Sequence, residues 1–166
     1  MRRASSRENY RFPRRPRPRD EACDCLGFRP AGLAHPRNPP HVVACRAWLT
    51  DVLAAGRRVI LPEMSDYGIR RSLIQNNSVL ALSRLDRLGR QSEYLPLNTA
   101  VMRHAAELWA WARNAGLPTA SNLALDGDVN LAAQALSLGV PVVVATDNVA
   151  HLARFVPARR WQDITP

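Results

Sequence analysis

The chain has 166 residues, of which 46% are hydrophobic, and this is enough for one domain with a sizeable core. Its 23 basic residues, all arginine, outnumber 14 acidic ones, but the excess is concentrated at the start of the chain, so charge alone does not indicate a nucleic-acid-binding domain. The sequence has no run of roughly 18 apolar residues and no signal-peptide core, which argues against a membrane or secreted protein and predicts a cytoplasmic one.

The first 22 residues differ in composition from the rest. They are rich in arginine and proline and contain almost nothing to bury, so we expect a disordered tail over residues 1–22 and one folded domain over residues 23–166. Eight arginines and two acids give residues 1–20 a net charge of +6. The tail is either a basic arm that contacts nucleic acid or a solvated or non-native segment without a role.

Regular patterns begin near residue 39. Apolar residues at helical spacing, with proline, glycine and capping residues at the ends, predict helices over 39–56, 63–74, 79–89, 98–116 and 127–138. Short apolar runs predict strands over 57–62, 93–97 and 141–146, whereas the segment around Gly27 hardly resembles a buried strand. Continuously apolar strands separated by helices are typical of a parallel sheet covered on both faces. The sequence therefore predicts an α/β fold.

Acidic residues gather where this fold would place a ligand. Parallel sheets bind ligands beyond the carboxyl ends of their strands, at a switch in strand order. Acids follow two predicted strands and open the helix between them; they are Glu63, Asp66, Asp126, Asp128 and Asp147. Converging carboxylates repel one another unless a cation neutralises them, and Mg²⁺ and Mn²⁺ prefer oxygen ligands. The pattern predicts a Mg²⁺ or Mn²⁺ site suited to phosphodiester hydrolysis.

Each candidate also has a structural interpretation. Glu63, Asp66 and Asp128 lie in first helical turns, and Asp126 could cap its helix, positions that favour acids in any protein. Asn148 could offer an amide oxygen to a metal or simply make a turn. Arg70 and Arg71 could contact the phosphates of a nucleic acid or lie on a solvated helix face. The hydroxyl group of Thr146 could hold a metal-bound water or a phosphate.

One histidine and two tryptophans have structural explanations of their own. His151 is expected to be a packed histidine at the base of the site. Trp109 and Trp111 lie two residues apart on one predicted helix and so face different ways. We expect one of them in the core and the other at a contact with a second copy or another protein.

Five segments together resemble the PIN-domain ribonucleases, in particular the VapC-like toxins of type II toxin–antitoxin systems. They are ACRAWL, VILPEMSDYGIRRSLI, YLPLNTAVMRHAAELWA, LDGDVNLAAQAL and VVATDNVAHLARF, within roughly residues 26–166. The resemblance implies a PIN-like three-layer α/β/α sandwich with a central parallel sheet. It also implies a Mg²⁺- or Mn²⁺-dependent, single-strand-specific endoribonuclease that forms a homodimer and is held silent by a cognate antitoxin.

The acidic positions of that family are only half matched. The resemblance assigns Asp128 to one of them, with Asp126 two residues ahead, and Asn148 to another, beside Asp147. The remaining two fall on Gly27 and on Gly68.

Substitutes for the missing acids lie nearby. Glu63 and Asp66 share the predicted helix of Gly68, and Asp24 precedes Gly27. We therefore predict Asp128, Asp147 and Glu63 as catalytic residues. The predicted metal ligands are Asp128, Asp126, Asn148 and Asp66.

The two glycines leave an alternative open, a catalytically inactive PIN-like protein that binds RNA or a partner protein. A shifted reading frame at the start of the gene would account for Gly27 but not for Gly68. A small-molecule enzyme is disfavoured, because the sequence has no glycine-rich phosphate loop and no nucleophile beside a base.

Overall fold

The computed structural model describes residues 23–26, 39–121 and 125–166. The predicted tail over residues 1–22 and Gly27 lie outside the described residues. The strands are β1 (Cys23–Leu26), β2 (Val59–Pro62), β3 (Glu93–Leu95), β4 (Val142–Ala145) and β5 (Ala158–Arg159). The helices are α1 (Pro40–Ala54), α2 (Glu63–Gln75), α3 (Val79–Gln91), α4 (Thr99–Asn114), α5 (Gly127–Ser137), α6 (Val149–Leu152) and the 3-10 helix η2 (Trp161–Asp163).

The strands form one parallel sheet in the order β3-β2-β1-β4-β5. The chain builds outwards from β1 through β2 to β3 and then returns to the other side of β1 with β4 and β5. The strand order therefore switches between β1 and β4, where Leu26 is in register with Ala145. This is the place at which parallel sheets bind ligands.

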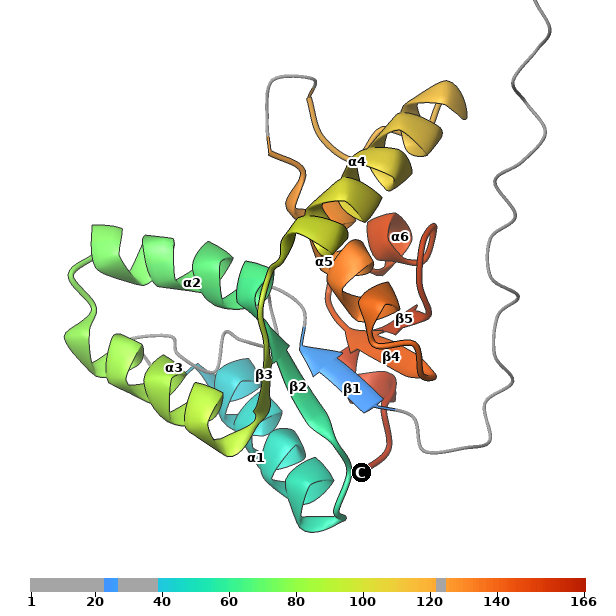
Figure 1. Ribbon diagram of the computed structural model, residues 1–166. Helices are drawn as coiled ribbons and strands as arrows, with labels where there is room; N and C mark the ends of the chain where they lie inside the picture. The colour runs from blue at the N-terminus through green and yellow to red at the C-terminus, as the bar shows by residue number, and fades with distance from the viewer. Residues whose placement is uncertain (1–22, 27–38, 122–124) are drawn as a thin grey trace, which may run out of the picture.

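Helices cover both faces of the sheet, as predicted (Figure 1). Neighbouring residues of a strand point to opposite faces, and β2 shows the consequence. Ile60 packs in a core with α4, α5 and α6, while Val59 and Leu61 pack in a second core with α1, α3 and the end of the chain. The three-layer α/β/α arrangement is confirmed.

Helix boundaries follow the sequence signals with one exception. Asn98 caps α4 by accepting a hydrogen bond from Val101 N at 2.9 Å, and Gly116, at φ +72°, follows its last turn. The predicted end at Gly89 is wrong, because α3 continues to Gln91. Gly89 lies against the sheet instead: a Cβ there would meet the Leu61 side chain at 3.8 Å.

Strand β1 was not predicted, and it ends at Leu26, where the segment over residues 26–38 that hardly resembles a strand begins. That segment after Leu26 lies outside the described residues. The segment CDCL forms β1, the central strand, paired with β2 on one side and β4 on the other. A four-residue strand with an aspartate in it lacks the apolar run that marks a buried strand, so only the pairing of its backbone with two neighbours reveals it. The short elements α6 and β5 were likewise not predicted.

Candidate functional site at the carboxyl edge of the sheet

The carboxyl ends of the strands gather the predicted site residues at one edge. Strand β2 leads directly into α2 at Glu63, and β4 leads into Thr146, Asp147 and Asn148. The first turn of α5 reaches the same edge, because its Asp128 contacts the segment after β4.

Asp128 is the centre of this contact. Its Oδ2 accepts a hydrogen bond from Asn148 Nδ2 at 2.7 Å and lies 3.1 Å from His151 Nδ1. The side chain of Asp128 is 14% exposed and that of His151 38% exposed, so the pair lies at the surface of the edge and not in the core. The sequence pattern therefore brought Asp128 and Asn148 together correctly. His151 was expected as a packed histidine at the base of the site. It does lie there, three residues after Asn148 and against Asp128, but its side chain is only partly buried.

The environment of Asp128 disfavours its negative charge. Burial raises the pKa of its carboxyl group above the ordinary aspartate value, and the charge of Asp126 raises it further. The hydrogen bond and charge of His151 act in the opposite direction without cancelling the effect of burial. A carboxylate held in this way gains from a bound cation, because the cation replaces the solvation that burial removes.

Asp126 has a structural role. Its Oδ1 accepts from Val129 N at 3.2 Å, which makes it the N-cap of α5, and its Oδ2 accepts from the Thr119 hydroxyl. Asp126 is buried, and both of its carboxylate oxygens have protein donors. The capping interpretation of this residue is confirmed.

Glu63 and Asp66 are also engaged by the protein. Glu63 Oε2 accepts from Leu97 N at 2.6 Å and so ties the start of α2 to the segment before α4. Asp66 is buried and accepts from Arg70 Nε at 3.1 Å and Nη2 at 3.0 Å. Arg70 Nη2 also contacts Asp86 of α3 at 2.8 Å.

Tyr94 completes the group around Asp66, with its hydroxyl 3.4 Å from Asp66 Oδ2. Burial, together with the charges of Asp66 and Glu63, raises the pKa of Tyr94 to about 12. The tyrosine therefore stays protonated and donates to the carboxylate. Since Arg70 already neutralises Asp66, neither residue is free to bind a metal or a phosphate without breaking this cluster.

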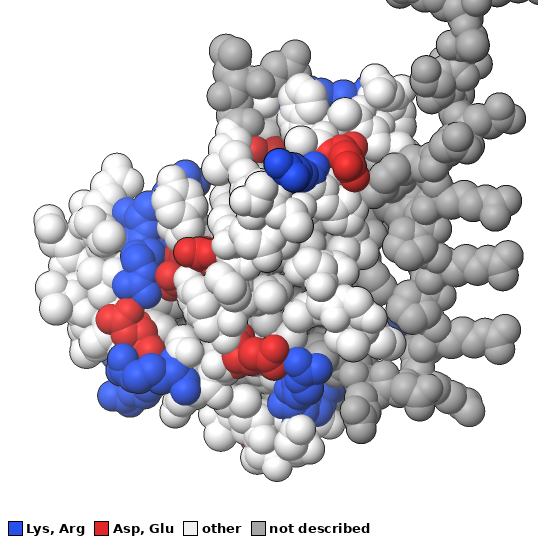
Figure 2. Space-filling model, viewed as in Figure 1, with Lys and Arg blue, Asp and Glu red and all other residues white. Residues whose placement is uncertain are grey.

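The other predicted nucleic-acid contacts differ in accessibility. Arg71 is exposed and lies over the Tyr67 ring, 5.4 Å from its centroid. Thr146 is buried, and its Oγ1 accepts from Asn148 N at 3.0 Å, so it shapes the turn after β4. On the α2–α3 side of the face in Figure 2, basic side chains form a short column with acidic side chains beside it and at its end.

Asp147 is exposed directly after β4. Its charge acts on Cys45 of α1, whose thiol pKa is raised to about 12 by burial first and by Asp147 second. Asp147 is therefore within electrostatic reach of α1, and solvent can reach its carboxylate.

The described residues do not assemble a cage of acids. Within those ranges no three histidine, cysteine, aspartate or glutamate side chains are placed to hold a metal ion together. Magnesium, however, is usually bound through one or two carboxylates, with water and substrate phosphate completing its shell. Asp128 fits such a reduced site, and Asn148 would add an amide oxygen if its side chain turned over.

Comparison with solved structures clarifies the architecture. VapBC-1 from nontypeable Haemophilus influenzae matches with 19% identity and a TM-score of 0.62, over 85% of this chain and 99% of the matched chain. FitAcB from Neisseria gonorrhoeae matches with 16% identity and a TM-score of 0.64, over 85% and 99%. DNA-bound VapBC from Salmonella typhimurium matches with 20% identity and a TM-score of 0.58, over 84% and 98%.

The chain has the VapC-like PIN fold. At these identities the likeness establishes the fold, and it confirms the architecture expected from the sequence. No protein-family model and no curated protein matches the sequence. None of the helices in the described ranges combines the length and apolar character needed to cross a membrane.

Proposed function

We propose that this VapC-like PIN protein is the toxin of a toxin–antitoxin pair, an endoribonuclease that hydrolyses single-stranded RNA with Mg²⁺ or Mn²⁺ and acts as a homodimer. The observation that carries the proposal is the Asp128–Asn148–His151 cluster. It lies at the carboxyl edge of the sheet, beside the strand-order switch, in a fold shared with toxin–antitoxin complexes.

In this proposal Asp128 is the principal metal ligand. Asn148 and His151 both contact its Oδ2 and hold the carboxylate in one orientation. A bound divalent cation lowers the pKa of water and stabilises charge on the phosphate. Asp147, exposed and next in the chain to Asn148, would accept a proton from the attacking water, as the new P–O bond forms and the bond to the leaving oxygen breaks.

Glu63 and Asp66 have supporting roles here. Glu63 holds the start of α2 against the segment before α4, and Asp66 anchors Arg70. Arg71, exposed on the same helix, is the arginine available to an RNA phosphate.

A cognate antitoxin would cover apolar surface that the chain leaves open. Ile74 at the end of α2 and Val79 and Leu80 at the start of α3 are all more than half exposed. Side chains of this kind, adjacent on a helical hairpin, suit an apolar partner segment. Co-expression with the neighbouring gene, followed by purification of a complex, tests this part of the proposal.

The decisive experiment is cleavage of a mixed single-stranded RNA pool by the purified chain, with Mn²⁺, with Mg²⁺ and with EDTA. We expect cleavage with either metal and none with EDTA. RNA that is retained but never cleaved by folded protein would favour the second candidate function, a non-catalytic RNA-binding PIN protein. The Asp66–Arg70 pair and Gly68 favour that candidate, because they leave the α2 side of the site without an available acid.

Replacing Gly68 by glutamate should strengthen metal binding. Gly68 is half-buried in α2, where the VapC-like pattern has an acid. Glycine inside a helix costs roughly 0.5–1 kcal/mol relative to alanine, so removing it should raise the melting temperature without metal. We expect the further rise on adding Mn²⁺ to be larger in Gly68→Glu than in wild type, as measured by thermal denaturation.

Gly68→Gln is the matched control, since it adds the same bulk and helix propensity without charge. It should gain stability but show the wild-type response to Mn²⁺. An equal metal response in both variants would remove position 68 from the metal site.

A further inference from the structure

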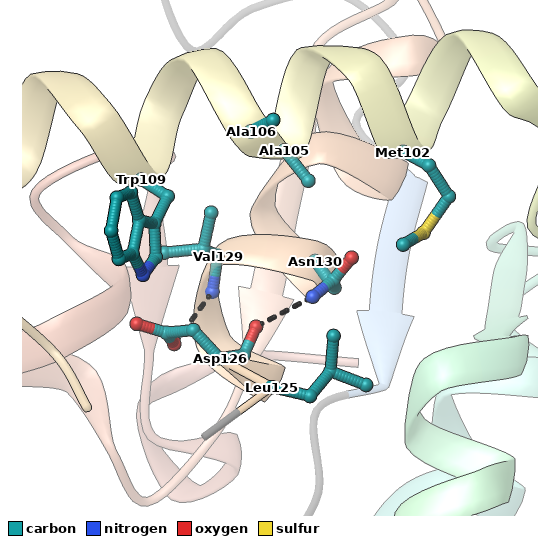
Figure 3. A pocket seen from close by; sticks show the side chains of 8 residues that line it. All are labelled: Met102, Ala105, Ala106, Trp109, Leu125, Asp126, Val129 and Asn130. Carbon is teal, nitrogen blue, oxygen red and sulfur yellow. Dashed lines mark hydrogen bonds between the residues drawn. The ribbon is translucent and has the colours of Figure 1, made fainter. Parts of the chain in front are cut away.

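A pocket lies between α4 and the first turn of α5 (Figure 3). Its walls are apolar and aromatic apart from two polar residues, the N-cap of α5 and an asparagine in its first turn. The lining residues are Met102, Ala105, Ala106, Trp109, Leu125, Asp126, Val129 and Asn130. The cavity measures about 260 Å³. Its polar end belongs to the same helical turn as Asp128, which lies two residues from both Asp126 and Asn130.

Asn130 presents an unpaired acceptor in this pocket. The residue is 4% exposed, and its Nδ2 donates to Asp126 O at 2.8 Å. That bond fixes the orientation of the amide, so Oδ1 points away from Asp126 and towards α4 (Figure 3). Oδ1 has no hydrogen-bond partner. A buried acceptor without a donor is costly, so this atom favours a ligand that brings an N–H group.

Trp109 supplies an aromatic wall. The Arg113 guanidinium lies over its ring, 4.2 Å from the centroid, and donates from Nη2 to Ala120 O at 2.7 Å. Arg113 Nε is the other buried side-chain atom that lacks a partner among the described residues. Of the two unsatisfied atoms, the acceptor on Asn130 belongs to the pocket lining, and the donor on Arg113 belongs to the residue stacked on Trp109.

We propose that this pocket binds one nucleobase of the RNA substrate, and that it prefers bases with an exocyclic amino group. Proteins that recognise single-stranded RNA stack splayed bases on aromatic side chains and read their edges by hydrogen bonds. Here the base stacks on Trp109, its amino group donates to Asn130 Oδ1, and Met102 and Leu125 close the apolar sides. Adenine, cytosine and guanine carry such an amino group. Uracil does not: its one edge donor, N3–H, lies between two carbonyl oxygens that Asn130 Oδ1 would repel.

The inference rests on the proposed RNA substrate and adds a subsite for one base. Asp128 faces Asn148 and His151, while the pocket faces α4, so the phosphate and the base would occupy two faces of one helical turn. A base held there fixes which phosphodiester lies beside Asp128. Cleavage would then depend on the identity of that base.

Binding of short dye-labelled adenylate, cytidylate and uridylate oligonucleotides in EDTA tests the proposal without cleavage. Wild type should bind the first two about fivefold more tightly than uridylate, the effect of one hydrogen bond. Trp109→Leu should weaken binding of all three by about tenfold or more, because stacking is lost. Asn130→Leu should remove the preference and leave uridylate binding unchanged.

Tyr67→Leu is the matched control, because Tyr67 also lies beneath an arginine four residues later in a helix, but away from the pocket. It should leave the base preference as in wild type. If Asn130→Leu does not fold, nuclear magnetic resonance of the wild type with adenosine and uridine monophosphates gives the answer. The Trp109 indole and Asn130 amide signals should move, and further with the adenine nucleotide.

Several results would overturn the inference. The first is that the wild type does not bind RNA. The second is that Trp109→Leu binds RNA as tightly as the wild type and with the same base preference. The third is that added nucleotides leave the NMR signals of Trp109 and Asn130 unmoved. If Trp109→Leu instead separates a dimer into monomers while the base preference persists, the pocket is a contact between copies. A chain that selects bases but never cleaves would contradict the nuclease proposal alone; one that cleaves with unchanged selectivity in Trp109→Leu would contradict this proposal alone.

Discussion

Asp128→Asn should abolish metal-dependent RNA cleavage, lowering the rate by about a thousandfold or more. The substitution keeps the shape of the side chain but removes the negative charge that the proposed cation needs. Losing several kcal/mol of transition-state stabilisation from a bound metal corresponds to a loss of this size. Initial rates on a labelled RNA with Mn²⁺ provide the measurement.

The same variant should not lose stability at neutral pH. The pKa of Asp128 is raised in the folded protein, so the folded state binds its proton more tightly than the unfolded chain does. Ionised Asp128 therefore destabilises the fold as pH rises through the raised pKa. This contribution disappears below the unfolded value of about 3.9. Without metal, Asp128→Asn should melt at or above the wild-type temperature at pH 7.

Asp51→Asn is the control for both measurements, because Asp51 is an exposed acid on α1 away from the edge of the sheet. It should cleave and melt like wild type. Cleavage by Asp128→Asn at the wild-type rate would eliminate Asp128 as the metal ligand. Strong destabilisation in the absence of metal would instead show that the carboxylate is structural.

Most helices and strands could be predicted in order from the sequence, because the residues that start and end them act locally along the chain. The start of α1 is marked by Pro39 and Pro40, and the ends of α4 by Asn98 and Gly116. These residues act on their neighbours in the chain, so sequence alone places the helix ends. Strand β1 has no such signal. It is specified by pairing with β2 and β4, which lie far along the chain, and its sequence CDCL carries no apolar run.

The site was predictable in part, for a related reason. Two aspartates in LDGD are equally good helix caps, so the sequence could not say which one caps and which one faces the edge. The fold decides this: Asp126 accepts from Val129 N, and Asp128 meets Asn148. The pairing of Asp66 with Arg70 follows from their spacing of four residues, a signal that the sequence offered.

Contacts between elements far apart in the chain could not be predicted from the sequence. Arg70 meets its second partner, Asp86, only because α2 packs against α3. The backbone N–H that donates to Glu63 belongs to Leu97, and the hydroxyl near Asp66 belongs to Tyr94, both in or just after β3. These contacts decide that one predicted metal ligand, Asp66, and one predicted catalytic acid, Glu63, already have protein partners. Counting acids along the chain therefore overstated the number available to a metal.

Gln134→Leu should destabilise the fold more than any other single change discussed above. Gln134 is fully buried in α5, and its amide joins three elements. Its Oε1 accepts from Met64 N at the start of α2, at 3.1 Å, and its Nε2 donates to Leu95 O at the end of β3, at 2.8 Å. Leucine has similar bulk and satisfies neither group, so a backbone N–H and a backbone C=O lose their partners.

Each buried polar group left unpaired costs roughly 1–3 kcal/mol, which gives about 2–6 kcal/mol for the pair. For a domain of this size we expect a fall in melting temperature of roughly 5–20 °C. Gln75→Leu, the same change at the exposed end of α2, should shift it by no more than about 2 °C. Equal melting temperatures for the two variants would mean that water replaces the Gln134 amide, and that α5 is held to α2 and β3 by apolar packing alone.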